Sequence, residues 1–368
     1  MGVFTKEDLK QFQSEPLAQK FQRTLSKVAE WYSYWGNEVY VSFSGGKDSS
    51  VLADICGYWC SIIKAPLYLV FVDTGLEYPE IRSHVKSFAE HLRKKHQIEV
   101  VLDILRPQKR FDEVIKEYGY PVISKEVCNV VRQARISLER NDGTYSYRLK
   151  RIRGELLDKD GNPSIFNQQK YEPLLYVDFR CSEYCCNVMK KKPSKEYEKQ
   201  TGRKPIIATM AEESKLRAQV WMKDGCNAFE SDRPKSTPMS FWKQQDVLQY
   251  IKENDTPIAS VYGDVVYAES PDQLRFEDVG IDCGGHDPLT TTGCDRTGCI
   301  FCGFGCHLDG NPSRFERLKE THPRQYEYCI GGGEYDENGV WKPNKQGLGM
   351  GHVFDELNKI YGEGFIRY

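Results

Sequence analysis

Apolar residues recur with two different spacings along this chain of 368 residues. Short apolar runs typical of buried strands occupy 38–43, 67–72, 98–104 and 204–210. Segments with apolar residues at roughly helical spacing occupy 5–34, 50–63, 79–95 and 111–118. Strands that alternate with helices of this length predict an α/β fold, in which a Rossmann-like parallel sheet carries helices on both faces.

The regular alternation stops at residues 126–178, which we interpret as an insertion. Asp142-Gly143 and Asp160-Gly161 within it are typical of hairpin turns. The predicted organisation is an N-terminal helical segment (1–37), a nucleotide-binding α/β domain (38–280) and a cysteine-rich, helical C-terminal region (281–368). That C-terminal region is expected to complete a metal site.

A glycine-containing loop joins the first strand to the helix after it. Its residues are Ser44, Gly45, Gly46, Lys47, Asp48 and Ser49. The two glycines allow a tight turn and a close approach to a ligand, because neither has a Cβ. The N–H groups at the start of a helix favour an anion, and Lys47 adds a positive charge. The loop therefore predicts a phosphate site, although its spacing differs from the common G-x-x-x-x-G-K-[ST] phosphate loop.

Net charge, apolar runs and cysteine content limit the classes of protein to which the chain can belong. The net charge of −2 gives no global electrostatic case for nucleic acid. No apolar run is long enough to span a membrane and the first residues are polar, so we expect a cytoplasmic protein with no membrane partner. Thirteen cysteines in a large chain of this kind indicate metal or redox chemistry rather than disulfides.

Two groups of cysteines stand out. Cys185-Cys186 and Cys299-x-x-Cys302 together offer four thiolates, which could hold a [4Fe–4S] cluster or tetrahedral zinc. Adjacent cysteines favour the cluster, because each can reach a different iron. Free thiols are the third alternative. Further cysteines could replace a ligand or carry sulfur: Cys181, Cys283, Cys294 and Cys306.

The order of motifs resembles the phosphoadenosine phosphosulfate reductase family of PP-loop ATP pyrophosphatases. It comprises SGGKDS, the stretch VDTG with Asp73 and Thr74, the cysteine pair, E-S-x-x-R with Ser214 and Arg217, and C-x-x-C. The resemblance covers roughly residues 38–305 and includes the iron–sulfur pattern of adenylylsulfate reductases.

This resemblance implies a site for ATP, or for adenylyl sulfate, with Mg²⁺ held by Asp48 or Asp73. Lys47, Asp48 and Arg217 are the predicted catalytic residues, and the arginine would pair bidentately with phosphate or sulfate oxygens. The predicted nucleotide-binding residues are Ser44, Gly45, Gly46, Lys47, Asp48, Ser49, Asp73, Thr74, Ser214 and Arg217. The alternative for Asp73 is a simple helix cap.

Two departures from the reductases favour an ATP-using relative. The loop keeps both Lys47 and Asp48, and the chain ends in GEGFIRY where reductases have a glutamate–cysteine–glycine motif. We therefore expect adenylylation with release of pyrophosphate, followed by sulfur transfer, as in the DNA phosphorothioation proteins and tRNA thiolases that share this plan. The alternatives are reduction of adenylylsulfate or phosphoadenylylsulfate to sulfite, and a non-catalytic nucleotide-binding iron–sulfur protein.

The segment 132–153 is rich in arginine and also contains Tyr145 and Tyr147. It could contact a phosphate backbone, or it could be an ordinary solvated helix face and hairpin. The expected partners are a nucleotide, a sulfur donor such as a cysteine desulfurase or thioredoxin-like protein, nucleic acid as a candidate acceptor, and a second copy of the chain as a candidate homodimer.

Overall fold

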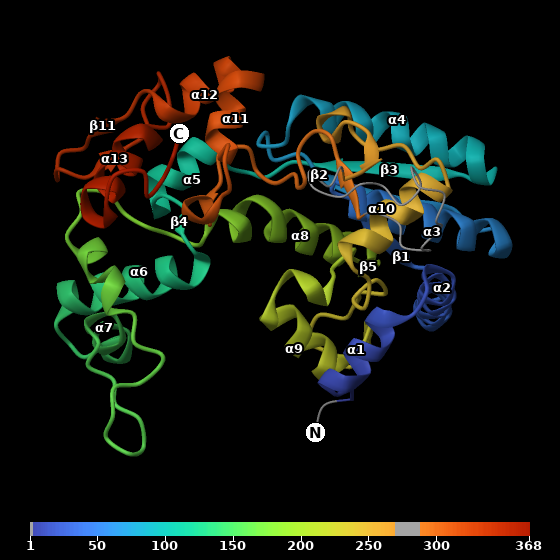
Figure 1. The fold of residues 1–368 in the computed structure, drawn as a ribbon, viewed down its shortest axis with the longest axis horizontal. Helices are drawn as coiled ribbons and strands as arrows, with labels where there is room; N and C mark the ends of the chain where they lie inside the picture. The colour runs from blue at the N-terminus through green and yellow to red at the C-terminus, as the bar shows by residue number, and fades with distance from the viewer. Residues whose placement is uncertain (1–2, 269–287) are drawn as a thin grey trace, which may run out of the picture. The chain divides into compact units, whose positions relative to one another are not determined.

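The computed structural model describes residues 3–268 and 288–368, which form two compact units. The first unit contains residues 1–73, 77–106 and 194–297, and the second contains 74–76, 107–193 and 298–368. The predicted insertion at 126–178 belongs to the second unit, together with the C-terminal residues. Figure 1 shows the elements of both units.

A six-stranded sheet organises the first unit, with strand order β3-β2-β1-β5-β7-β6. Its strands are β1 (Val39–Ser42), β2 (Leu67–Val72), β3 (Val100–Leu105), β5 (Lys204–Ile206), β6 (Asn227–Ala228) and β7 (Lys235–Ser236). All neighbours pair in parallel except β6 and β7. The predicted parallel α/β sheet is therefore confirmed, although β5 is shorter than the expected strand over 204–210.

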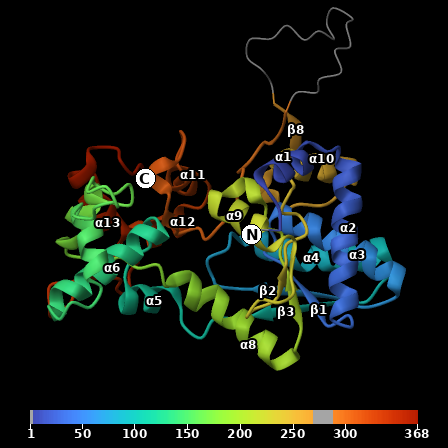
Figure 2. The ribbon, with the colours of Figure 1, turned by 90° about the horizontal axis from the view of Figure 1, so that it is seen from below.

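Helices cover both faces of this sheet (Figure 2). One face packs on α2 (Leu17–Tyr34), α3 (Lys47–Ile63), α4 (Pro79–His96) and α10 (Gln244–Glu253). Val39 and Val41 point into that core, whereas Tyr40 between them packs with Tyr197 of α8 (Lys192–Thr201) on the other face. Because successive side chains of a strand face opposite ways, a strand covered on both sides must be apolar throughout.

The N-terminal helix is interrupted, contrary to the prediction of one continuous helix. The single helix expected over 5–34 is two helices, α1 (Lys6–Ser14) and α2, with Glu15-Pro16 between them. A proline disfavours helical backbone in the residue before it and cannot donate a hydrogen bond. Thr5 caps α1 and exchanges hydrogen bonds with Asp8, as its spacing predicts.

The first unit also contains a short hairpin of β8 (Val265–Tyr267) and β9 (Leu289–Thr291), and α9 (Lys215–Asp224). The second unit is mainly helical. Its helices are α5 (Phe111–Tyr118), α6 (Lys125–Arg140), α7 (Ser146–Arg153), α11 (Arg314–Thr321), α12 (Pro323–Ile330) and α13 (Met350–Tyr361). Its strands form two pairs, β4 (Val122–Ile123) with β10 (Gly303–Phe304) and β11 (Glu334–Tyr335) with β12 (Trp341–Lys342).

The turn predicted at Asp142-Gly143 joins the two helices α6 and α7, so it is not a strand hairpin. Asp142 instead accepts a hydrogen bond from the N–H of Thr144 and shapes a local turn. At Asp160-Gly161 the chain does reverse between Leu157 and Pro163, which form an antiparallel bridge. Within the described residues, none of the helices combines the length and the apolar character that a membrane crossing requires.

Candidate functional site: a phosphate loop and a cysteine group

The loop after β1 is a tight turn that leads directly into α3. Gly45 has φ +73°, and a Cβ there would lie 2.8 Å from Ile81 Cγ2 and 2.9 Å from Val85 Cγ2. Glycine is therefore required both for the backbone angle and for the space. Gly46 precedes the first turn of α3, which begins at Lys47 rather than at the predicted residue 50. Lys47 and Asp48 consequently lie on the helix itself, at its positive end.

Lys47 is buried, with 3% of its side chain exposed. Its ammonium donates to the backbone carbonyl of Asp295 at 2.8 Å and lies 3.7 Å from Asp48 Oδ1. Burial raises the pKa of Asp48 and the charge of Lys47 opposes that rise. Asp48 Oδ1 is buried and accepts no hydrogen bond within the described residues. A buried carboxylate oxygen of this kind at the loop fits the hard oxygen ligand that Mg²⁺ prefers.

Hydroxyl groups complete the loop. The Ser44 and Ser49 hydroxyls lie 3.0 Å apart, and Ser49 Oγ donates to the carbonyl of Gly46 at 2.8 Å. Tyr262, a residue without a predicted role, brings its hydroxyl to the same turn. That hydroxyl accepts from the Lys47 N–H at 3.3 Å and lies 2.5 Å from Thr297 Oγ1. No motif marks Tyr262, because its role depends on a contact between residues more than 200 positions apart.

Ser214 and Arg217 form one local structure at the start of α9. Ser214 caps the helix by accepting from the N–H of Arg217 at 3.3 Å. The Arg217 guanidinium forms an ion pair with Glu213, which also pairs with Arg296 at 2.7 Å. Glu213 and Arg296 both act on the pKa of Asp48, the first raising it and the second lowering it. The glutamate of the E-S-x-x-R motif, for which no role was predicted, thus acts electrostatically on the phosphate loop.

Asp73 and Thr74 follow β2, but their surroundings differ. Asp73 forms an ion pair with Arg82 and lies 4.0 Å from the guanidinium of Arg106. Thr74 belongs to the second unit, where its hydroxyl accepts from the N–H of Leu76 at 3.2 Å. Since Asp73 already faces two arginines, Asp48 is the better candidate of the two to hold Mg²⁺.

The four cysteines expected to bind a cluster all belong to the second unit. The pKa of Cys186 is lowered to about 5, first by a hydrogen bond with Cys185 and then by Lys125 and Lys190. The pKa of Cys185 is raised by Cys186, by burial, and by the charges of Cys302 and Cys299. A π-helical turn, Asn187–Lys191, follows the pair. Such turns are frequent at functional sites.

The charges around these thiols suit an anionic metal centre. Lys125 acts on both Cys186 and Cys302, and Arg314 acts on Cys302. Four cysteines, two of them beside cationic side chains, match in number and type the donors of a [4Fe–4S] cluster, which binds them as thiolates. Among the residues that the structure describes, no three His, Cys, Asp or Glu side chains are grouped closely enough to hold a single metal ion.

The other cysteines have varied surroundings. Cys181 and Cys128 are buried and hydrogen-bonded to each other, which lowers the pKa of Cys181. Cys306 is buried and donates to the carbonyl of Gly303 at 3.1 Å. Cys294 belongs to the first unit, whereas the four candidate ligands belong to the second. Cys283 lies outside the described residues.

Several arginines of the basic segment hold the second unit together. Arg135 donates to the carbonyls of Leu174, Val177 and Phe179 at 2.6–3.0 Å. Arg132 pairs with Glu183 at 2.7 Å. Their charge and hydrogen-bonding capacity serve internal packing, so the count of arginines overstates the basic character of the surface. Arg140 and Lys150 are exposed, as are Tyr145 and Tyr147.

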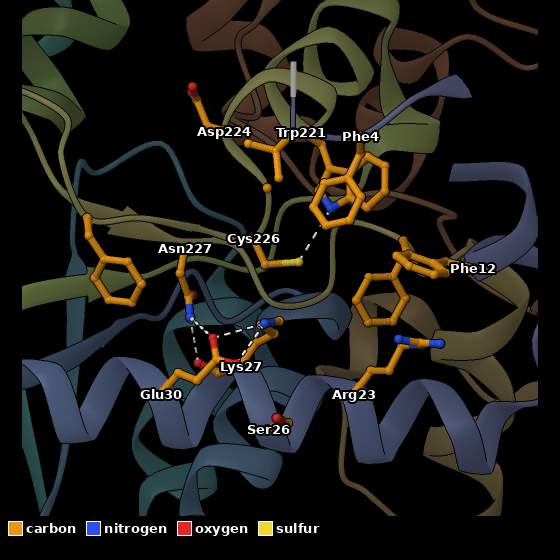
Figure 3. Close-up of a pocket in the computed structure, with 14 residues that line it drawn as sticks. Phe4, Phe12, Arg23, Ser26, Lys27, Glu30, Trp221, Asp224, Cys226 and Asn227 are labelled. Carbon is orange, nitrogen blue, oxygen red and sulfur yellow. Dashed lines mark hydrogen bonds and ion pairs between the residues drawn. The ribbon is translucent and has the colours of Figure 1, made fainter. Parts of the chain in front are cut away.

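A separate pocket of about 420 Å³ lies in the first unit (Figure 3). Phe4 stacks on Trp221 with ring centroids 4.6 Å apart, and Phe12 meets Trp221 edge to face. Asn227 donates to Glu30 across the polar side of the pocket. None of the residues predicted to bind a nucleotide lines it. The pocket is therefore explained by the packing of the N-terminal aromatic residues on Trp221.

Comparisons with known proteins agree with the motif order. The sequence model of the phosphoadenosine phosphosulfate reductase domain matches residues 38–144 and 150–303. An uncharacterized protein of Methanocaldococcus jannaschii is 34% identical over 113 residues, which are 30% of this chain and 25% of that protein. The chain therefore matches only about a quarter of the length of this curated relative.

Two solved structures are similar at low identity. The NMN synthetase of Francisella tularensis has a TM-score of 0.33 and 13% identity, over 73% of this chain and 83% of that one. The U34-tRNA thiolase NcsA of Methanococcus maripaludis, determined with its [4Fe-4S] cluster, has a TM-score of 0.32 and 14% identity, over 71% of each chain.

Proposed function

Because the chain belongs to the phosphoadenosine phosphosulfate reductase domain family, as its motifs predicted, we propose that it is an ATP pyrophosphatase that activates an acceptor by adenylylation. The observation that carries this proposal is the loop at the start of α3. A buried lysine and a carboxylate with one buried oxygen that accepts no hydrogen bond within the described residues lie there, at the positive end of a helix. These groups suit a polyphosphate and its metal ion.

In the proposed reaction an acceptor oxygen attacks the α-phosphorus of ATP. The bond from that phosphorus to the bridging oxygen breaks, and pyrophosphate leaves with the electron pair. Lys47 binds the phosphates and stabilises the charge that develops on them, and Asp48 holds Mg²⁺. Arg217 contributes a second cation once its guanidinium turns from Glu213 to phosphate. Fixed charges of this kind favour the transition state without a covalent intermediate on the protein.

The cysteine group would serve the sulfur-transfer step that follows. Cys185, Cys186, Cys299 and Cys302 are the proposed ligands of a [4Fe–4S] cluster, which would supply a site to bind or relay sulfur. Lys125, Lys190 and Arg314 would offset the negative charge of the thiolates. The proposed partners are a sulfur donor, such as a cysteine desulfurase or thioredoxin-like protein, and a nucleic acid that carries the acceptor.

The products of ATP turnover test the proposal. The full chain is incubated with ATP labelled at the α-phosphate, with Mg²⁺ and either total transfer RNA or duplex DNA. Labelled AMP or an adenylylated acceptor should appear together with pyrophosphate, and Asp48→Asn should abolish both. Lys86→Ala, a change at an exposed lysine of α4, serves as the control. Formation of ADP and phosphate would refute the proposal. Steady formation of sulfite from adenylylsulfate with thioredoxin would favour the reductase instead.

A further inference from the structure

A short segment of the first unit, Thr291–Thr297, lies against the phosphate loop, and we refer to it as the strap. Its carbonyl at Asp295 accepts the Lys47 ammonium at 2.8 Å. Its Thr297 hydroxyl lies 2.5 Å from the Tyr262 hydroxyl, which in turn accepts the Lys47 N–H. A Cβ on Gly46 would lie 3.2 Å from the Tyr262 hydroxyl and 3.5 Å from Thr297 Oγ1. Two of the donors expected to bind phosphate thus already have partners in the chain.

The strap is an ordered part of the fold. The N–H groups of Gly293 and Cys294 donate to the carbonyls of Tyr262 and Val261 at 2.8 and 3.1 Å. At the other end, Arg296 pairs with Glu213 at 2.7 Å. Gly293 packs so closely that a Cβ there would lie 2.4 Å from the carbonyl oxygen of Val261. The strap is therefore held at both ends and crosses Lys47 between them.

We propose that the strap competes with ATP for Lys47 and is displaced from the loop when the nucleotide binds. This inference rests on the proposed function of the loop. A phosphate oxygen is charged and is a stronger partner for an ammonium than a neutral carbonyl. Binding must nevertheless first break the contacts of Lys47 with Asp295 and Tyr262. The apparent affinity for ATP is lowered by the fraction of molecules in which the strap is closed.

Substitution of Gly293 tests the inference directly. Gly293→Ala places a methyl group against the backbone of Val261 and Tyr262 and should loosen the strap while the Lys47 side chain itself is kept. Gly310→Ala is the matched control, because a Cβ there has nothing within 4 Å. In calorimetric titration, ATP should bind Gly293→Ala about tenfold more tightly than the unaltered protein, and Gly310→Ala should be unchanged. Thr297→Val, which removes only the hydrogen bond to Tyr262, should bind about threefold more tightly.

Hydrogen exchange gives a second readout in the unaltered protein. The amides of Gly293 and Cys294 should exchange faster when ATP is bound, whereas the amide of Gly349, bonded to Gly331 at 2.8 Å, should not change. Equal ATP affinity in all variants, or unchanged protection of both strap amides with ATP bound, would overturn the inference alone. Absence of ATP binding in every protein would overturn the phosphate-loop assignment and, with it, the role of the strap.

Discussion

The charge of Lys47 is the part of the proposed site that can be removed most cleanly. We consider Lys47→Met, which keeps an unbranched side chain of similar length in a position that is 3% exposed. The substitution removes the ammonium that would bind the phosphates. A charge-assisted hydrogen bond contributes about 1.5–3 kcal/mol, so ATP affinity should fall roughly 10- to 150-fold. Because the same ammonium holds Asp295, release of the strap should keep the loss toward the lower end of that range.

The free energy of unfolding of Lys47→Met should change much less than its affinity for ATP. The variant loses the hydrogen bond to Asp295, which contributes about 1 kcal/mol, and no longer needs to bury an ammonium. The free energy of unfolding in urea should therefore change by only about 1 kcal/mol. Asp48 loses the cation that opposes the effect of burial, so the pKa of Asp48 should rise further. That change would weaken metal binding at neutral pH in addition to the loss of the direct contact.

Calorimetric titration with ATP and Mg²⁺ at 0.15 M salt measures the effect. Lys86→Met is the control, since Lys86 is exposed on α4, and its affinity should remain within twofold of the unaltered protein. A folded Lys47→Met protein that bound ATP within twofold of the unaltered protein would refute the phosphate loop as the nucleotide site.

Three further predictions concern the loop, the cysteines and stability. Gly45→Ala should lower the free energy of unfolding by about 1–3 kcal/mol and weaken ATP binding, because the added Cβ meets Ile81 and Val85. Gly36→Ala is the control: Gly36 has a similar φ but open space around it, so this change should cost only the backbone strain of about 1 kcal/mol. Anaerobically purified protein should contain about four irons per chain. The variant Cys186→Ala should lose the iron and the control variant Cys329→Ala should retain it. A content of one zinc per chain would contradict the cluster. Burial opposes the ionisation of Asp54, but hydrogen bonds from His96, Lys95 and Tyr250 lower its pKa overall. The ionised Asp54 should therefore stabilise the folded protein fully above the pKa that this carboxyl has in the unfolded chain, and this stabilisation should be lost as the pH falls through its lower pKa in the folded protein. Urea titrations at several pH values should show a smaller pH dependence of the free energy of unfolding in Asp54→Asn.

Local pattern was sufficient to predict the α/β core. β1, the loop and α3 follow one another in the chain, so apolar runs, glycines and helical spacing locate them without tertiary information. The errors in the same region are also local. Pro16 marks the break between α1 and α2, and the start of α3 at Lys47 is three residues earlier than its apolar pattern suggests. A helix can begin before its first apolar residue, because the first turn needs only backbone N–H groups that are not yet paired within the helix.

The surroundings of the loop could not be predicted in this way. Tyr262, Glu213 and the strap come from distant parts of the chain, and tertiary packing brings them to α3. The contact between Lys47 and the strap uses the backbone carbonyl of Asp295, which any residue could supply. Such a contact leaves no signature in residue type or spacing. The motif E-S-x-x-R led to roles for Ser214 and Arg217 alone, whereas its glutamate, Glu213, is the residue that pairs with both Arg217 and Arg296.

The arginines of 132–153 show why composition alone cannot identify a binding surface. Arg135 is half-buried and its guanidinium donates to three backbone carbonyls, so it satisfies polar groups that would otherwise lack a partner in the second unit. Arg132 and Arg151 pair with Glu183 and Glu126. In the sequence these residues look the same as Arg140 and Lys150, which are exposed. For the proposed nucleic-acid acceptor we therefore expect contacts with Arg140, Lys150 and the exposed rings of Tyr145 and Tyr147, because Arg132, Arg135 and Arg151 are already engaged by the fold.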